Sequence, residues 1–264
     1  MSGTVHLDHA GGAAWLTLDR PGRGNALVPE LLIALRSGVA EARLAGARAL
    51  VITGAGRAFS TGGDVAAFAA HASDTAALRA YAAEIVGELN AAILDLLAFP
   101  APVLAAVNGP VTGGSAGLML AADMVTMSET AFLQPYYSEV GFAPDGGWTA
   151  LLPERIGSAR ALKALYLNER VSAHDCLKLG IADHVCEADR LRAVTGGQVA
   201  TILEKDAASL AVSRANVWSP ARRARFAAAL EREREGFLSL IARPETLERM
   251  QRFLAAVRPA EPAK

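Results

Sequence analysis

Cysteine is almost absent from this chain of 264 residues, which contains only Cys176 and Cys186. Two cysteines cannot build a disulfide framework, so we expect a reducing, cytoplasmic location. Residues 1–12 are polar and lack the basic start and apolar stretch of a secretory signal. Pro or Gly interrupts the apolar runs before they reach about 18 residues, so we predict no membrane-spanning helix and no membrane partner.

The chain also lacks an excess of charge of either sign, because 26 basic residues balance 27 acidic ones to a net charge of -1. This balance argues against a nucleic-acid partner. The five histidines have no metal-ligand spacing with the cysteines, and complete dinucleotide- and phosphate-binding glycine motifs are absent. We therefore predict no metal and no prosthetic group. Hydrophobic residues make up 52% of the chain, enough for a large ordered core.

Glycine, by contrast, gathers in two turns. The first glycine turn is residues 57–64 (RAFSTGGD), and the second glycine turn is residues 108–117 (NGPVTGGSAG). Each follows a short aliphatic segment and precedes a helical pattern. Such turns can aim two backbone N–H groups at one point, as a developing oxyanion requires. Their other use is structural, as tight turns that need glycine. The pair predicts an enzyme that polarises a carbonyl group.

Hydrophobic periodicity predicts strand–turn–helix units followed by helices alone. We expect a hairpin over residues 5–18 and strands at 49–53, 103–107, 124–128 and 181–185. We expect helices at 29–44, 65–98 (weakly specified near 71–75), 115–122, 151–156, 159–167 and 173–179. From residue 190 the pattern is helical, with breaks at 218–220 and 243–244. This order predicts an α/β core, residues 1–190, and a helical C-terminal region, residues 191–264.

Residues 113–117 also match the G-x-S-x-G nucleophile elbow of α/β-hydrolases. In that alternative Ser115 would be the nucleophile, Asp145 the acid, and His174 or His184 the base. The elbow needs its serine at the end of a strand, whereas a loop precedes Ser115 here. A hydrolase is therefore a remote alternative.

Two aspartates lie in or near glycine turns. Asp64 follows Gly63 and is expected to cap the helix that starts there, since Asp is favoured at helix starts. Asp145 lies in the apolar, glycine-bounded segment 141–148 (GFAPDGGW). A carboxyl group in apolar surroundings has a raised pKa and suits proton transfer. Its other use would be as a turn residue or a helix cap.

Four segments carry a resemblance to a known family. They are residues 18–27 (LDRPGRGNAL), 58–64 (AFSTGGD), 102–114 (PVLAAVNGPVTGG) and 172–185 (SAHDCLKLGIADHV). In this order they resemble the crotonase (enoyl-CoA hydratase/isomerase) superfamily over nearly the whole chain. The resemblance implies a spiral of ββα units with a helical C-terminal region that builds a homotrimer or a dimer of trimers.

The resemblance also implies an acyl-CoA thioester as substrate, with coenzyme A present as part of that substrate. The N–H groups of Gly63 and Gly114 would form its oxyanion hole. The adenosine end of coenzyme A would lie near four residues, Arg23, Ala26, Thr61 and Val65. Helices over residues 231–257 are candidates to reach the active site of a neighbouring subunit.

The chain departs from the family pattern at the catalytic acids. Hydratases of the family use two glutamates to place and activate a water molecule. The first would fall at Gly117, and the second at Tyr136 or Tyr137. Glu139 lies two residues beyond Tyr137, an offset that faces another side of a helical turn, so we do not expect it to substitute. The glutamate pair is therefore missing.

Asp145 sits where other members carry a single acid, and those members are similar to Δ3,Δ2-enoyl-CoA isomerases and ring-enoyl isomerases. One carboxylate can take a proton from C2 and return it at C4. We therefore predict an enoyl-CoA isomerase with Asp145 as its acid and base. The alternatives are an enoyl-CoA hydratase and a non-catalytic acyl-CoA binder. Four aromatic residues are candidates to line the acyl pocket or to pack in the core: Tyr136, Tyr137, Phe142 and Trp148.

Overall fold

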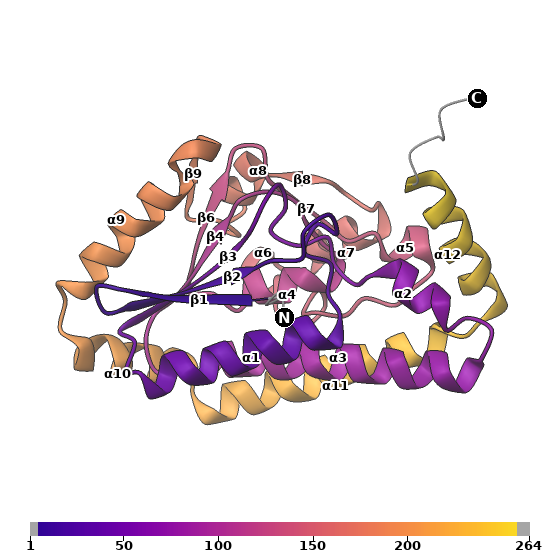
Figure 1. Cartoon of the computed structure of the whole chain (residues 1–264), viewed down its shortest axis with the longest axis horizontal. Helices are drawn as coiled ribbons and strands as arrows, with labels where there is room; N and C mark the ends of the chain where they lie inside the picture. Colours follow the sequence, from indigo (N-terminus) through magenta and orange to yellow (C-terminus); the bar gives the residue numbers. More distant parts are fainter. Residues whose placement is uncertain (1–4, 258–264) are drawn as a thin grey trace.

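The computed structural model of the chain describes residues 5–257, which form two β-sheets covered by helices (Figure 1). The larger sheet has the order β1-β2-β3-β4-β6-β9. Its strands are β1 (Val5–Ala10), β2 (Ala13–Leu18), β3 (Ala49–Gly54), β4 (Val103–Val107), β6 (Met124–Ser128) and β9 (His184–Cys186). β1 and β2 form the predicted antiparallel hairpin, and the other neighbouring strands are parallel. The smaller sheet contains β5 (Val111–Thr112), β7 (Phe132–Gln134) and β8 (Val171–Ser172).

The helices include most of the predicted ones, close to their expected bounds, and a short helix at Tyr137–Val140 that was not predicted. They are α1 (Pro29–Leu44), α2 (Val65–Ala70), α3 (Thr75–Leu97), α4 (Ala116–Leu120), α5 (Tyr137–Val140), α6 (Leu152–Ile156), α7 (Ser158–Tyr166), α8 (Ala173–Lys178), α9 (Leu191–Leu203), α10 (Ala207–Val217), α11 (Pro220–Leu240) and α12 (Pro244–Val257). The 3-10 turn Gly113–Ser115 precedes α4, and a second, Ala188–Arg190, precedes α9. Within residues 5–257, none of these helices is long and apolar enough to cross a bilayer.

Capping residues explain several helix boundaries. Asp64 accepts a hydrogen bond from Ala67 N, which confirms its predicted place as the cap of α2. Asp74 caps α3 in the same way, so the weakly specified stretch is a break between two helices. Pro220 occupies the first turn of α11. One break was not predicted: Asp206 accepts from Ser209 N and starts α10 as a separate helix.

The central strands of the larger sheet, β2, β3, β4 and β6, are buried on both faces, as their continuous apolar runs indicate, whereas the edge strand β1 is mostly exposed. On one face, Leu16, Leu50 and Ile52 belong to the main core together with residues of α1 and α3. On the other face, Trp15, Val51 and Leu104 pack with α9 in a second cluster. Figure 1 shows α1, α3 and α11 together on one side of the sheet and α9 away from them.

The C-terminal helices share the main core with the α/β part. Leu230 and Phe237 of α11 are buried in the same cluster as the residues of α3 against which this helix packs. The predicted boundary near residue 190 falls between β9 and α9. The outer ends of the two predicted units, residues 1–4 and 258–264, lie outside the described residues.

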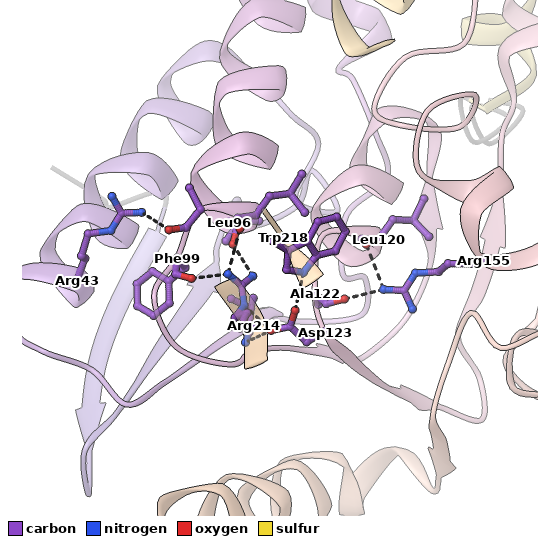
Figure 2. Close-up of polar contacts among 12 residues, drawn as sticks. Arg43, Leu96, Phe99, Leu120, Ala122, Asp123, Arg155, Arg214 and Trp218 are labelled. Carbon is purple, nitrogen blue, oxygen red and sulfur yellow. Dashed lines mark hydrogen bonds and ion pairs between the residues drawn. The ribbon is translucent and has the colours of Figure 1, made fainter. Parts of the chain in front are cut away.

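Two arginines, the buried Arg214 and the partly buried Arg155, hold the ends of neighbouring segments together near the start of α11 (Figure 2). Arg214 donates to the carbonyl oxygens of Leu96, Leu97 and Phe99 at the end of α3, and it pairs with Asp123 at 2.7 Å. Trp218 Nε1 also donates to Asp123, at 3.0 Å. Arg155 donates to two carbonyls after α4, those of Leu120 and Ala122. These guanidinium groups satisfy carbonyl oxygens that helix ends leave without partners.

Candidate active site

The two glycine turns meet because they follow neighbouring parallel strands, whose carboxyl ends lie at the same edge of the sheet. Ser60 N donates to Pro110 O at 3.1 Å, and Thr112 N donates to Ser60 O at 3.1 Å. Gly62 has φ of +75°, and a Cβ atom there would lie 2.6 Å from Thr112 O. A glycine at this position therefore allows both the left-handed backbone and the close approach of the turns.

The N–H groups of Gly63 and Gly114 are both left without a protein partner. Gly62 O and Asp64 N bond to Leu27, so the intervening N–H of Gly63 points away from that residue. Gly114 lies in the turn Gly113–Ser115, where the first N–H groups have no partner within the helix. In the part of the chain that the structure describes, neither N–H donates to another group. Both residues line one cavity.

This cavity has a volume of about 580 Å³ and brings every predicted site residue together. The predicted residues that line it are Arg23, Ala26, Thr61, Gly63, Val65, Gly114 and Asp145. Much of the remaining wall is apolar. Among residues 5–257, the carboxylates that line it are Asp64 and Asp145. Asp64 is already engaged, because it caps α2 and pairs with Arg20 at 3.2 Å.

Asp145 is buried directly beside the second glycine turn. The side chain is only 7% exposed. Tyr137 Oη donates to Asp145 Oδ1 at 2.5 Å and to the Asp145 carbonyl oxygen at 3.0 Å. A Cβ atom on Gly114 would lie 2.8 Å from the same Oδ1. A carboxyl group and a free N–H donor thus face the cavity side by side.

Burial raises the pKa of Asp145 to about 7. The hydrogen bond from Tyr137 opposes this effect and lowers the pKa, whereas the nearby charge of Glu233 raises it. Burial and the adjacent Asp145 hold the pKa of Tyr137 well above its ordinary value, so its hydroxyl stays a donor. Near neutral pH, Asp145 is therefore able both to accept and to return a proton.

A sequence profile of the enoyl-CoA hydratase/isomerase family matches residues 8–260. The chain belongs to this family. A probable enoyl-CoA hydratase from Rhodobacter capsulatus is 34% identical over 178 residues, a match that covers 67% of this chain and 66% of that protein. The chain thus spans just under two thirds of the length of this relative.

One further relative supports this family, and one solved structure shows the same fold. The trans-2-decenoyl-[acyl-carrier-protein] isomerase of Streptococcus mutans is 31% identical over 214 residues, 78% of each chain. The crystal structure of an enoyl-CoA hydratase from Bacillus halodurans superposes with a TM-score of 0.88 and 23% identity, over 94% of this chain and 99% of that one. The predicted crotonase-like α/β fold with a helical C-terminal region is confirmed.

Gly117, where the family resemblance implies the first glutamate of the hydratases, has no room for a side chain. A Cβ atom on Gly117 would collide with Ile93 Cδ1 and would lie 2.6 Å from Gly146 O. Gly146 itself has φ of +60° and packs against the backbone of Gly114. The turn that carries Asp145 therefore occupies the space that a glutamate at position 117 would need.

The other residues considered from the sequence fall into two groups. Tyr136, Tyr137 and Phe142 line the cavity as predicted. Trp148 has the other predicted use, packing in the core: it is fully buried and donates its Nε1 hydrogen to Gly113 O at 2.8 Å, behind the turn. Glu139 is exposed on α5.

The geometry does not favour the hydrolase alternative. The hydroxyl group of Ser115 is fully buried, and it donates to two carbonyl oxygens, those of Ser60 and Thr112. Neither His174 nor His184 lines the cavity. Ser115 therefore joins the two glycine turns, and in this structure it is not presented as a nucleophile.

Sequence reasoning missed the part of the wall that the C-terminal helices supply. Phe237 of α11 and Phe253 and Leu254 of α12 line the cavity of their own chain. The rings of Phe68, Phe142 and Phe237 pack against one another, with centroids 5.0–5.8 Å apart. The spacing of apolar residues on α11 and α12 predicts that each helix has a buried face. It does not predict which part of the chain that face packs against.

Proposed function

We propose that this chain is an acyl-CoA enzyme that moves the double bond of an enoyl-CoA thioester, with Asp145 as its single acid and base. The observation that carries the proposal is the placement of one buried carboxyl group directly beside Gly114, in a cavity whose other carboxylate is engaged elsewhere. The raised pKa of Asp145, about 7, supports both directions of proton transfer at neutral pH.

In the proposed reaction, the Asp145 carboxylate takes a proton from C2 of a 3-enoyl-CoA. The electron pair of the C–H bond forms a dienolate, whose negative charge resides largely on the thioester oxygen. The N–H groups of Gly63 and Gly114 donate to this oxygen, and losing one such donor typically costs about 10²–10³ in rate. Protonated Asp145 then returns the proton at C4, and the double bond lies between C2 and C3.

Hydration is the second candidate, since the relative from Rhodobacter capsulatus is named a probable enoyl-CoA hydratase. The relative from Streptococcus mutans carries the name of an isomerase. A positioned water in the family's hydratases needs two carboxylates. Gly117 has no room for one, and the hydroxyl of Tyr137 is already committed to Asp145. These contacts favour isomerisation, which needs one base and no water.

We propose that the two ends of the substrate bind at different parts of the cavity wall. The adenosine part of coenzyme A would lie near Arg23, Ala26, Thr61 and Val65, where the exposed Arg23 offers a cation to phosphate. The acyl part would contact the apolar wall, where Phe142 and Phe237 favour bulky or aromatic groups. We also propose that the chain assembles as a homotrimer or as a dimer of trimers.

The test is an isomerase assay with purified chain and a 3-enoyl-CoA, in which the product is the conjugated 2-enoyl-CoA. We expect turnover, and we expect Asp145→Asn to lower it by about 10²–10⁴-fold, the usual contribution of a positioned acid or base. The exposed Glu139→Gln is the matched control and should retain full activity.

Normal turnover by the Asp145→Asn variant would overturn the assignment. Water addition to a 2-enoyl-CoA without any isomerisation would favour the hydratase. Binding of acyl-CoA with neither reaction would favour a non-catalytic binder.

A further inference from the structure

Glu233 is a buried carboxylate that holds the turn immediately after Asp145. It lies on α11, 86 residues further along the chain than Gly147, and is 5% exposed. Its Oε2 accepts from Gly147 N at 2.7 Å. Its Oε1 accepts from Thr149 N at 2.7 Å, from Thr149 Oγ1 at 2.6 Å and from Ala150 N at 3.0 Å. All four contacts come from donors, an arrangement that favours the ionised carboxylate.

No cation offsets this charge in the described part of the chain. The neighbouring Arg234 pairs with Glu231 at 2.7 Å and donates to Ala83 O, so its guanidinium is used elsewhere. Burial raises the pKa of Glu233, as expected for a carboxylate without a counter-ion. Burying such a charge is costly unless hydrogen bonds replace its hydration, and here neutral donors of one turn supply them all.

We propose that Glu233 is a positioning residue for Asp145: it anchors the turn behind the carboxyl group and places a fixed negative charge there. The inference rests on the proposed role of Asp145 as acid and base. Two groups thereby fix the position of Asp145. Tyr137 of α5 bonds to its carboxyl group, and Glu233 of α11 bonds to the turn that follows it. Glu233 itself does not line the cavity, so α11 takes part in the reaction through a side chain that does not contact the substrate.

The surroundings of Asp145 contain few other charges that could have this effect. Tyr137 and Glu233 are the titratable groups that face it from α5 and α11. On the side of the second glycine turn, a Cβ atom on Gly114 would lie 2.8 Å from Asp145 Oδ1 and 2.7 Å from Leu89 Cδ2 of α3, so the residues here carry no charge. The charge of Glu233 raises the pKa of Asp145, whereas the bond from Tyr137 lowers it. Removing the charge of Glu233 should therefore lower the pKa of Asp145, and removing the hydroxyl of Tyr137 should raise it.

The test compares Glu233→Gln and Glu233→Asp with Glu235→Gln, which alters an exposed glutamate on the same helix. The readout is the titration of the Asp145 carboxyl carbon by NMR in protein labelled with carboxyl-¹³C aspartate, assigned by its loss in Asp145→Asn. In Glu233→Gln, which removes the charge, the midpoint should fall by on the order of 0.5–1 pH unit. In Glu235→Gln it should not move.

Glu233→Asp distinguishes the two proposed effects of Glu233, its hydrogen bonds to the turn and its negative charge. Its carboxylate is retained, so the midpoint of Asp145 should stay near that of the unmodified protein. Its shorter side chain cannot reach the same donors, so kcat should fall by about 10-fold or more through misplacement of Asp145. The pH profile of kcat should follow the NMR midpoint in each variant.

An unchanged midpoint in folded Glu233→Gln would overturn the inference. If that variant does not fold, Glu233→Asp decides, and a kcat equal to that of the unmodified protein would overturn it. The midpoint is measured without substrate. A shifted midpoint in a protein that isomerises no enoyl-CoA would therefore overturn the proposed function while supporting the role of Glu233 behind Asp145.

Discussion

Replacing the proposed base should make the protein more stable at alkaline pH. The pKa of Asp145 is about 7 in the folded protein, against 3.8 for an ordinary Asp, chiefly because the group is buried. Between pH 3.8 and about pH 7, Asp145 keeps its proton in the folded state, whereas in the unfolded chain it has released that proton. The free energy of unfolding therefore decreases as the pH rises toward 7, and it stays lower above 7. Asp145→Asn is neutral at every pH and removes this effect.

The size of the effect follows from the pKa. One pKa unit corresponds to about 1.4 kcal/mol, so the part that develops between pH 5 and pH 8 is about 3 kcal/mol. The asparagine carbonyl can still accept the hydrogen bond from Tyr137. Its amide hydrogens have no acceptor there, which costs about 1–3 kcal/mol at either pH. That cost cancels when the two pH values are compared.

The assay is thermal unfolding of both proteins at pH 5 and pH 8 in the absence of ligand. For a chain of this size, each kcal/mol moves Tm by about 2–4 °C, so the Tm of Asp145→Asn relative to the original should rise by about 6–12 °C from pH 5 to pH 8. Glu139→Gln, which alters an exposed carboxylate, should show no such rise. A difference that is the same at both pH values, or smaller at pH 8, would refute the raised pKa of Asp145.

Three further predictions concern Tyr137 and the two glycines of the cavity, Gly114 and Gly63. Tyr137→Phe removes the bond that lowers the pKa of Asp145, so the midpoint in the pH profile of kcat should rise by on the order of one pH unit; an unchanged or lower midpoint would contradict this. Gly114→Ala should lower kcat by about 10²–10³, because its Cβ would lie 2.7 Å from Leu89 Cδ2 and 2.8 Å from Asp145 Oδ1. Gly63→Ala should lower kcat by only about 10-fold, since its Cβ would contact just the edge of the Phe68 ring, at 3.1 Å or more. Equal losses in the two glycine variants would count against the geometry.

Much of the fold could be predicted because the relevant signals are local. Buried parallel strands are continuous apolar runs, and Pro220 and Asp64 mark helix starts by their own chemistry. The meeting of the two glycine turns also follows from local signals, since each closes a parallel strand. The small sheet could not be predicted, because Phe132–Gln134 is a three-residue strand that gains its partners only after folding.

The sequence predicted that Gly63, Gly114 and Asp145 would come together, and they line one cavity, but it did not predict the contacts that support Asp145. Asp145 was recognisable because an aspartate stands alone in an apolar glycine-bounded turn. Glu233 was not, because it stands between Arg232 and Arg234 in a segment that resembles a solvated helix face. For Trp148 the sequence left pocket lining and core packing open, since an aromatic residue near a site packs equally well behind it. Burial at such positions is set by distant segments, which no local pattern contains.

The contact between Gly117 and Gly146 has an evolutionary consequence. A glutamate at position 117 is blocked as long as the Asp145 turn keeps its present course against Gly114. Under the proposed function, gaining a glutamate there would therefore require changes in two separate segments, and the first change alone would disturb the packing or misplace Asp145. A single substitution therefore cannot convert the proposed one-acid design into a two-glutamate design, because both segments must change together.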